Sequence, residues 1–298
     1  MTRPAEMIGV DWGTTRARAW LLAGDGAVQA HASSDAGVSA VAAGGFPAAF
    51  DALCGPWLRG AARPPVVMAG MVGSRNGWRE APYAGAPCGV AELVTAICKV
   101  NLGGRALHIV PGVDYRDEDS YDVMRGEETM ALGAGVADGL VCLPGTHSKW
   151  VEMLGGRIAR FASFITGELY AALSSSFVAR LASEPEAESH VADGLAAAGL
   201  SGGLPRALFQ ARTRVRGGLM PGAGVTPFIS GLLVGAEIAG ACSLFGSVQS
   251  VHLVAGEPQR AVYRQGLAAR SVDAHVVDPE TAFLSGLHRL AETAGLHG

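Results

Sequence analysis

The chain has 298 residues and a formal net charge of -4; 49% of its residues are hydrophobic and 17% are charged. A chain of this length is expected to form two compact domains, and its weakly acidic balance excludes the basic surface that a nucleic-acid partner requires. The five cysteines are odd in number and form no C-x-x-C pair, which favours a reduced, cytoplasmic protein over a disulfide framework or a protein zinc site.

The N-terminal part of the chain predicts a mixed sheet. Strands are expected at 7–12, 16–22 and 27–32, a helix at 46–58 and a buried strand in "PVVMAG". The first strand ends in a glycine turn, "GTT", which is typical of a nucleotide site, but the turn leads into a second strand instead of a helix. The first unit is therefore predicted to be a β-hairpin.

The middle of the chain repeats this arrangement. A strand in "ALHIVPG", a helix in "GEETMALGAGVAD" and a buried strand in "LVCLPG" precede a second hairpin, "KWVEMLGGRIARFASF", which turns at Gly155 and Gly156. Gly13-Thr14 corresponds to Gly145-Thr146, 132 residues later. The repeat predicts two related domains, with chance similarity in a glycine-rich chain as the alternative.

The C-terminal half is predicted to be α/β as well. Helices are expected at 167–183 and over most of 204–245, with connections near 184–203 and 217–224; a strand ending at Gly256, a helix in "QRAVYRQGLAAR", a strand in "DAHVV" and a closing amphipathic helix follow. No membrane partner is expected, because Asp138 and Glu237 interrupt the most apolar runs and residues 1–7 lack the apolar region of a signal peptide.

The two glycine turns predict a clamp for phosphate groups. Glycine lets backbone N–H groups approach a ligand closely and threonine adds a hydroxyl donor, so residues Gly13, Thr14 and Thr15 and residues Gly145, Thr146 and His147 suit phosphate oxygens. Neither turn fits the P-loop or Rossmann pattern; simple hairpin bends are the alternative.

Three charged residues flank the turns. Asp11 ends the first strand, where a carboxylate can hold Mg²⁺ directly or through water, or can merely cap the turn. Arg16 and Lys149 follow the two turns and either neutralise phosphate charge or face solvent.

Several motifs together carry a family resemblance: "GVDWGTTRARAWLL", "GMVGSRNGWREAPY", "VMRGEET", "LPGTHSKWVEM", "FASFITGELYAAL" and "VYRQGLAAR". The first and fourth resemble the phosphate motifs of the actin, sugar-kinase and heat-shock ATPase superfamily, and the set resembles the 2-dehydro-3-deoxygalactonokinase family along essentially the whole chain. The resemblance implies an α/β fold of two ribonuclease H-like domains, the actin-like ATPase fold, with mixed sheets flanked by helices and an interdomain cleft. We expect domains at 1–138 and 139–280 and a closing helix at 281–298 that can return to the first domain.

The resemblance also implies an activity. It indicates an ATP-dependent kinase, with Mg²⁺, that phosphorylates the 6-hydroxyl of 2-dehydro-3-deoxy-D-galactonate in galactonate breakdown; homodimer formation stays open. A sugar acid needs a cation and several hydroxyl partners in a pocket. The loop "GSRNGW" supplies them: we expect Arg75 to pair with the carboxylate, Ser74 and Asn76 to bind hydroxyls, and Trp78 and Tyr83 to wall the pocket, or the segment is a plain polar loop.

The kinase reaction requires a carboxylate near the attacking hydroxyl. Glu127 stands where related sugar kinases carry aspartate at a helix start, which makes it the expected base; Asp122 and Glu128 are alternatives, and a carboxylate that merely favours the helix dipole explains the same residues. Arg125 is expected to hold either the transferring phosphate or the base.

Three further residues are placed at the site by the resemblance. Thr166 and Glu168 open a helix, where capping explains both and cleft lining is a second interpretation. Gly256 corresponds to the adenosine pocket of the superfamily, although a strand-to-helix turn explains it equally. The alternative functions are a kinase for a related acid such as the gluco epimer, an ATP hydrolase, and an ATP-gated regulator on the same fold.

Overall fold

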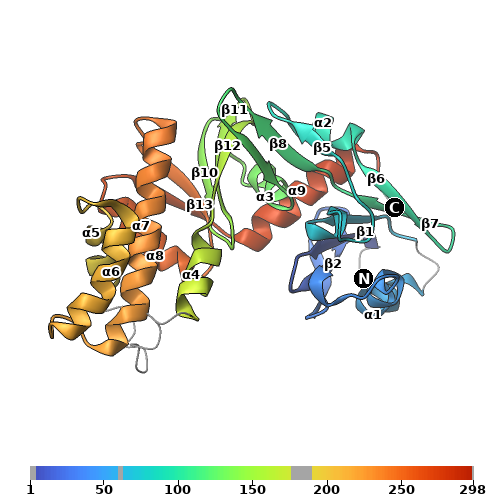
Figure 1. The fold of residues 1–298 in the computed structure, drawn as a ribbon. Helices are drawn as coiled ribbons and strands as arrows, with labels where there is room; N and C mark the ends of the chain where they lie inside the picture. The colour runs from blue at the N-terminus through green and yellow to red at the C-terminus, as the bar shows by residue number, and fades with distance from the viewer. Residues whose placement is uncertain (1–4, 60–62, 176–189, 297–298) are drawn as a thin grey trace. The chain divides into compact units, whose positions relative to one another are not determined.

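The computed structural model describes residues 5–59, 63–175 and 190–296. Contacts between residues divide the chain into two units, Met1–Asp138 with Met153–Phe161 and Pro279–Gly298, and Gly139–Glu152 with Ala162–Asp278 (Figure 1). Both units are α/β. The tip of the second hairpin, Met153–Phe161, groups with the first unit, although the sequence division placed it in the second.

The first unit is built on a six-stranded mixed sheet in the order β3-β2-β1-β4-β7-β6. β1, β2 and β3 run antiparallel, β4 and β7 run parallel to β1, and β6 returns antiparallel to β7. The strands are β1 Ala5–Trp12, β2 Ala17–Ala23, β3 Val28–Ser34, β4 Val66–Ala69, β6 Cys98–Leu102 and β7 Arg105–Ile109. The predicted hairpin and mixed sheet are therefore confirmed.

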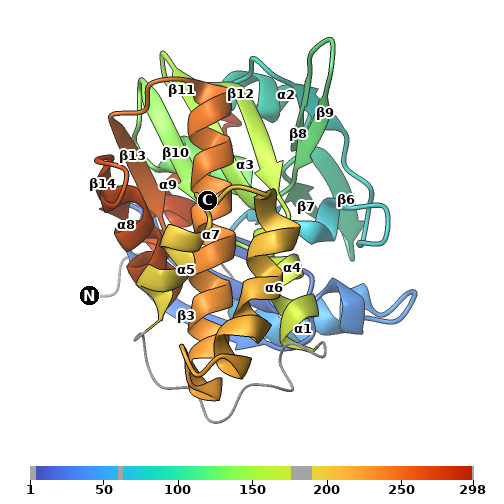
Figure 2. The same cartoon turned by 60° about the vertical axis from the view of Figure 1, so that its left-hand side comes forward.

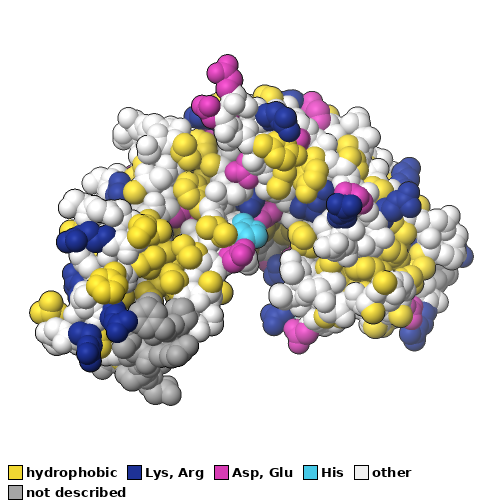
Figure 3. Space-filling view, in the orientation of Figure 1, with side chains coloured by type: hydrophobic (Ala, Val, Ile, Leu, Met, Phe, Trp, Pro, Cys, Tyr) yellow, Lys and Arg dark blue, Asp and Glu magenta, His cyan; other side chains and the backbone are white. Residues whose placement is uncertain are grey.

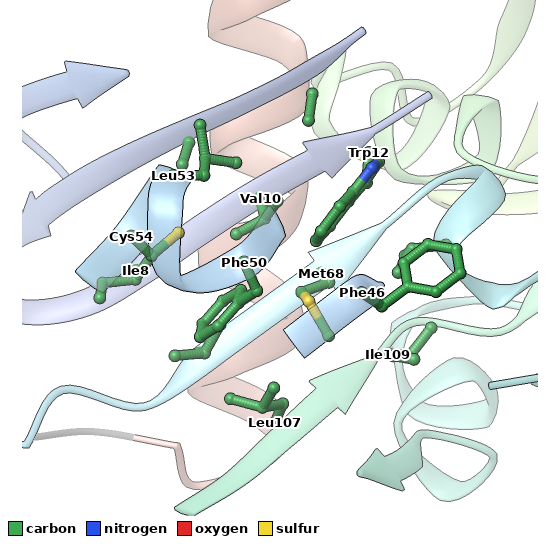
Figure 4. Close-up of a cluster of buried hydrophobic side chains, with 14 of the residues drawn as sticks. Ile8, Val10, Trp12, Phe46, Phe50, Leu53, Cys54, Met68, Leu107 and Ile109 are labelled. Atoms are coloured by element: carbon green, nitrogen blue, oxygen red, sulfur yellow. The ribbon is translucent and has the colours of Figure 1, made fainter. Parts of the chain in front are cut away.

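Helix α1, Phe46–Leu58, covers this sheet as predicted. Its buried residues Phe46, Phe50, Leu53 and Cys54 recur at helical spacing and so lie on one face of the helix. Figure 4 shows this face against side chains of the central strands, with Ile8, Val10 and Trp12 from β1, Met68 from β4, and Leu107 and Ile109 from β7. This apolar layer fixes the carboxyl ends of β1 and β4.

A second, three-stranded sheet in the first unit is not foreseen by the sequence pattern. Its order is β5-β8-β9, from Tyr83–Gly85, Gly112–Arg116 and Tyr121–Met124. The remaining elements are the short helix α2, Val90–Thr95, helix α3, Glu127–Gly133, the closing helix α9, Pro279–Thr293, and the 3-10 turns η1, Val38–Ala40, and η2, Met71–Gly73. The helix expected over 126–138 ends early at Gly133, and Gly135 follows with a φ of 74° that a right-handed helix does not allow.

The second unit contains a five-stranded sheet in the order β12-β11-β10-β13-β14. The strands are β10 Gly139–Leu143, β11 Ser148–Leu154, β12 Arg157–Phe164, β13 Ser250–Val254 and β14 Asp273–Val277, and β10, β13 and β14 run parallel. β11 and β12 are joined by Gly155 and Gly156, whose φ angles of 58° and 72° suit a tight hairpin turn. Each unit thus begins its sheet with the predicted strand and hairpin.

Helices pack around α7, Val225–Phe245, in the second unit. α4 Thr166–Ser174, α5 Val191–Ala197, α6 Gly203–Arg216 and α8 Gln259–Ala268 all contact α7, and Figure 2 shows α5, α6 and α7 side by side. α5 lies within the segment predicted to be a connection. Its Gly194 and Gly231 of α7 allow close contact, because a Cβ on either would lie 2.1 Å from a backbone carbonyl oxygen of the other helix.

Helix α7 is part of a helical segment, Gly222–Phe245, that is long and apolar enough to cross a membrane by length and composition alone. The sequence argument that Glu237 breaks the apolar run is therefore wrong. However, 56% of its most apolar window is buried inside the structure, and the Glu237 carboxylate is buried there too. We therefore describe α7 as the core helix of the second unit.

The contact between α3 and α9 generates a stability prediction. A Cβ added to Gly286 would lie 1.9 Å from the Thr129 carbonyl oxygen, so Gly286→Ala is expected to force the helices apart and to lower the free energy of unfolding by about 3 kcal/mol or more. Gly199→Ala is the control, because its Cβ would come no closer than 3.7 Å to any neighbour. Chemical denaturation should separate the two variants; equal unfolding free energies would contradict the packing argument.

Candidate functional site

The first glycine turn, residues 13–15 between β1 and β2, has its carbonyl side covered by the chain. The carbonyl oxygens of residues 13, 14 and 15 accept hydrogen bonds from the N–H groups of Val38, Ser39 and Gly37, with N–O distances of 3.0, 2.9 and 3.3 Å. Within each peptide unit the N–H points away from the C=O. The N–H groups of residues 14–16 therefore face the opposite side, beside the exposed residues Thr14 and Thr15.

The second glycine turn comprises residues 145–147, between β10 and β11. Its carbonyl groups also face the protein, but another segment covers them. The Thr146 carbonyl accepts the N–H of Glu168 at 2.9 Å. A Cβ on Gly167 would lie 2.3 Å from the Gly145 carbonyl oxygen, so the start of α4 closes against this side of the turn. The N–H groups of Thr146 and His147 consequently face away from α4, on a turn whose residues are exposed.

The residues that flank the two turns differ in environment. Arg16 is exposed and its Nε lies 3.2 Å from Asp35 Oδ1, a surface pair that contributes little to stability. Lys149 is 4% exposed, and its Nζ donates to the His147 carbonyl at 3.1 Å. The alternative that Lys149 faces solvent is therefore wrong. The exposed His147 Nε2 lies 2.6 Å from Glu168 Oε2.

Helix α4 begins at Thr166, but Thr166 is not its N-cap. The N-cap residue is Ile165, which makes no side-chain capping bond, so the capping prediction for Thr166 is wrong. The Thr166 side chain instead forms a hydrogen bond with Glu237. Glu168 lies in the first turn, as predicted. Both residues therefore connect α4 to other parts of the second unit.

Asp11 forms an ion pair across the first hairpin. Its Oδ2 lies 2.6 Å from Arg18 Nη2, because residues 11 and 18 are partners in the β1–β2 register. Burial raises the pKa of the Asp11 carboxyl, and the Arg18 charge and hydrogen bond oppose the shift. The site thus has a carboxylate whose charge is partly balanced before any cation is present.

Two glycines bring Asp11 and the start of α3 together. Gly70 follows β4 with a φ of 95°, and a Cβ there would lie 2.9 Å from the Trp12 carbonyl oxygen and 3.4 Å from Asp11 Oδ1. Gly126, with a φ of 109°, would place a Cβ 3.1 Å from the Gly70 Cα. The ends of β1 and β4 and the turn before α3 therefore meet with no room for side chains between them.

The carboxylates at the start of α3 hold that turn. The Arg125 N–H donates to Glu127 Oε2 at 3.0 Å, and the Gly126 N–H donates to Glu128 Oε2 at 2.6 Å. Glu128 is fully buried and also accepts from Thr129 Oγ1, whereas Glu127 is half-buried. Burial raises the pKa of Glu128 to about 7, and the Glu127 charge adds to the shift. The third candidate base, Asp122 on β9, accepts the N–H of Val123 at 2.8 Å.

The predicted substrate loop divides into exposed and buried parts. Arg75 and Asn76 are exposed, whereas the Ser74 hydroxyl is buried. The Trp78 ring lies 5.7 Å from the Phe50 ring and stacks on Phe46 at 6.1 Å, so it belongs to the core against α1. Tyr83 is 41% exposed, with the Arg125 guanidinium 4.3 Å from its ring centre.

A pocket of about 530 Å³ opens beside the second glycine turn, within the second unit. It lies between Pro144–Gly145, the start of α4, the face of α7 from Thr226 to Val234, and the start of α8 from Pro258 to Tyr263. Hydrophobic side chains gather over α4 and α7 in Figure 3. Gly256 is exposed, and an added Cβ would meet nothing within 4 Å, so close packing does not account for this glycine.

A chain of buried polar groups lies behind this pocket. Glu237 of α7 accepts hydrogen bonds from Trp150 Nε1 and from Tyr263 Oη, both at 2.8 Å. The Tyr263 hydroxyl lies 3.0 Å from Ser148 Oγ, which accepts the Gly145 N–H at 3.5 Å. Burial raises the pKa of Glu237 and these bonds oppose the shift. Sequence reasoning noted Glu237 only as an interruption of an apolar run, which was the one available signal.

Known proteins match this chain over most of its length. A profile of the 2-keto-3-deoxy-galactonokinase family matches residues 11–290. The chain belongs to this family. It is 35% identical to the 2-dehydro-3-deoxygalactonokinase of Escherichia coli (strain K12), over 96% of this chain and 98% of that protein.

Solved structures extend the comparison to the fold. The crystal structure of a 2-dehydro-3-deoxygalactonokinase-family protein from Sinorhizobium meliloti matches with a TM-score of 0.87 and 33% identity, over 96% of this chain and 98% of that one. The activator of 2-hydroxyisocaproyl-CoA dehydratase from Clostridium difficile matches with a TM-score of 0.52 and 11% identity, over 97% and 95% of the chains. The family member thus has the predicted two-domain actin-like ATPase fold.

The buried Glu128 generates a pH prediction. Its raised pKa means that the folded chain binds this proton more tightly than the unfolded chain, whose value is near 4.5. The resulting stabilisation is full at low pH and is lost as the pH rises through about 7. Between pH 5 and pH 8 the wild type should lose about 2 kcal/mol more unfolding free energy than Glu128→Gln. Parallel pH profiles in urea denaturation would show that Glu128 does not titrate in this range.

The Glu237 network generates a second stability prediction. Glu237→Ala removes the acceptor of the buried Trp150 and Tyr263 donors and the partner of the Thr166 side chain, and it leaves a cavity, so the free energy of unfolding should fall by about 3 kcal/mol. Tyr263→Phe removes one hydroxyl and should cost about 1 kcal/mol. Guanidinium denaturation measures both. A loss for Glu237→Ala no larger than that for Tyr263→Phe would contradict the central place of the carboxylate.

Proposed function

We propose that this family member is an ATP-dependent kinase that transfers a phosphoryl group to the 6-hydroxyl of 2-dehydro-3-deoxygalactonate. The products are 2-dehydro-3-deoxy-6-phosphogalactonate and ADP. Family membership and the identity to the named E. coli kinase support the substrate class. The structural observation that carries the proposal is the apolar pocket beside turn 145–147, because a nucleotide needs an apolar site for its base next to donors for its phosphates.

The nucleotide is assigned to the second unit. The base and ribose would occupy the pocket between α4, α7 and α8, with Gly256 two residues before the pocket residue Pro258. The phosphates would meet the N–H groups of Thr146 and His147, and Lys149 adds a buried positive charge beneath the same turn. In this proposal Thr166 lines the nucleotide pocket, and Glu168 orients His147.

Within the first unit, we propose its own glycine turn as a second phosphate-binding element and Asp11 as the ligand of the cation. The N–H groups of residues 14–16 face away from the covered carbonyls, beside the exposed residues Thr14 and Thr15, and the exposed Arg16 can leave Asp35 at little cost. Asp11 fits Mg²⁺ held mainly by water and phosphate oxygens, because Mg²⁺ in phosphoryl-transfer sites commonly takes only one or two protein carboxylates. When bound with ATP, Mg²⁺ would neutralise charge on the phosphates.

Glu127 is the proposed general base. Glu128 is fully buried and already accepts two hydrogen bonds, so it suits a structural role, while Glu127 is half-buried and directly follows Gly126, which packs against Gly70. As the 6-hydroxyl oxygen bonds to the γ-phosphorus, its proton passes to Glu127, and the bond from the γ-phosphorus to the bridging oxygen breaks to release ADP. Asp122 on β9 remains the alternative base.

An ADP-release assay tests the activity. The assay compares 2-dehydro-3-deoxygalactonate, its gluco epimer, a neutral sugar of similar size and no acceptor. We expect release that depends on the sugar acid, with the galacto epimer preferred. Release without acceptor would indicate an ATP hydrolase, release only with the gluco epimer would reassign the substrate, and ATP binding without turnover would favour a regulator.

The base assignment has its own test. Glu127→Gln should lower kcat by about 10²- to 10⁴-fold with little change in KM for ATP, because only the proton acceptor is lost. Glu118→Gln is the matched control, since Glu118 is an exposed carboxylate that precedes β9 in the same segment. If Glu127→Gln keeps full turnover, the base is Asp122 or Glu128 instead.

A further inference from the structure

The first unit contains an arginine whose charged group is buried with few partners. In the part of the chain that the structure describes, Nε and Nη1 of Arg125 and Oγ of Ser74 are the buried side-chain polar atoms without a hydrogen-bond partner. Those two nitrogens carry three N–H donors. Unpaired donors on a buried charge are costly, so a native structure that keeps them points to a partner that the protein itself does not supply.

The Arg125 guanidinium is also held firmly in place. Nη2 donates to the Ala81 carbonyl at 2.9 Å, and the group lies 4.3 Å from the centre of the Tyr83 ring. The backbone N–H of Arg125 is held by Glu127. These contacts orient the guanidinium without neutralising it, because each partner is a carbonyl, an aromatic ring or a carboxylate that binds the backbone.

The loop before Ser74 leaves space for this side chain. A Cβ on Gly73 would lie 3.0 Å from Arg125 Nη1 and 2.9 Å from the Ile109 side chain, so any larger residue would displace the guanidinium. Ser74 follows directly, with a buried hydroxyl that can donate to the same ligand. Loop 73–74 thus lies against the Arg125 guanidinium at Gly73 and carries a second buried donor without a partner at Ser74.

We propose that Arg125, assisted by Ser74, binds the carboxylate of the sugar-acid substrate. This assignment rests on the proposed function, whose substrate carries a single carboxylate. A guanidinium with free N–H donors matches a carboxylate in charge and in hydrogen-bonding capacity. Glu127 lies two residues away and binds the Arg125 backbone. One turn therefore positions both the proposed anchor of the substrate carboxylate and the proposed acceptor of the 6-hydroxyl proton.

The sequence alone favoured Arg75 for this role. Arg75 is exposed and lies next to Ser74, so a bond from Arg75 to the acid would stay exposed to water and be screened by salt. Arg125 instead has buried donors and a fixed orientation. The two assignments make opposite predictions for single variants.

The experiment compares Arg125→Gln, Ser74→Ala and Arg75→Gln with the exposed Arg79→Gln as control. KM values for the acid and for ATP come from ADP release, and calorimetry without ATP gives the Kd for the acid and for its uncharged amide. Arg125→Gln should raise the Kd and KM for the acid by about 10- to 100-fold, leave KM for ATP within about twofold, and abolish the preference for the acid over the amide. Ser74→Ala should raise the Kd by about fivefold, and Arg79→Gln should change nothing.

Several results would overturn the assignment. It fails if Arg125→Gln keeps the wild-type preference for the acid over the amide, or if Arg75→Gln loses that preference in its place. If Arg125→Gln does not fold, an unchanged Kd in Ser74→Ala overturns it. The binding arm needs no turnover, so a wild type that binds the acid but releases no ADP refutes the proposed kinase activity and still tests Arg125.

Discussion

The turn at Arg125 and Gly126 is the constraint on which the acceptor side of this protein depends. Two successive backbone N–H groups are each held by the carboxylate two residues later in the chain. Gly126 can then pack on Gly70 with a φ that other residues rarely adopt. Through Gly70 the turn contacts the end of β1, where Asp11 lies. One local hydrogen-bond pattern thus sets the positions of Arg125, Glu127 and Asp11, which we propose as the carboxylate anchor, the base and the Mg²⁺ ligand.

The two glycine turns share a strand, a turn and a second strand that the sequence reveals, but the segment that covers each turn differs. Both turns have carbonyl groups that face the protein and N–H groups that face away. In the first unit, residues 37–39 cover the carbonyls through their backbone N–H groups, whereas in the second unit the start of α4 does so. The strand, turn and strand recur in both halves because the sheet requires them. The segment that covers the carbonyl groups differs between the two units, so no sequence motif identifies it.

The sequence predicted the parts of the fold that depend on local pattern. Alternating or continuous apolar runs identify β1, β2, β4, β10 and both hairpins, and glycine pairs identify the turns. The β5-β8-β9 sheet was missed because its strands are short and of mixed burial, and because β5 pairs with β8 across the long segment 86–111. Helix α5 was missed because its small and polar residues resemble a connection, and its contact with α7 depends on tertiary packing.

The candidate site was harder to predict, because residue type does not reveal burial. "GSRNGW" contains donors suited to a sugar acid, but the sequence cannot show that Arg75 is exposed or that Trp78 packs on Phe46 and Phe50. Lys149 lies on a strand of alternating pattern and is nevertheless buried. The Arg125 guanidinium is held by contacts with Ala81 and Tyr83, more than 40 residues away in the chain. Only the folded chain brings these groups together.

The hydrogen bonds around Glu237 in the second unit run in a defined order from donor to acceptor. An ionised carboxylate only accepts hydrogen bonds, so the one proton of the Tyr263 hydroxyl points to Glu237. The Ser148 hydroxyl lies within hydrogen-bond distance of the Tyr263 oxygen and also bonds to Glu237, and its own oxygen accepts the Gly145 N–H. A single buried charge on an apolar helix therefore orients two hydroxyls and one backbone group in sequence. Because that last group belongs to the second glycine turn, this buried carboxylate helps to fix the conformation of the turn that we propose for phosphate binding.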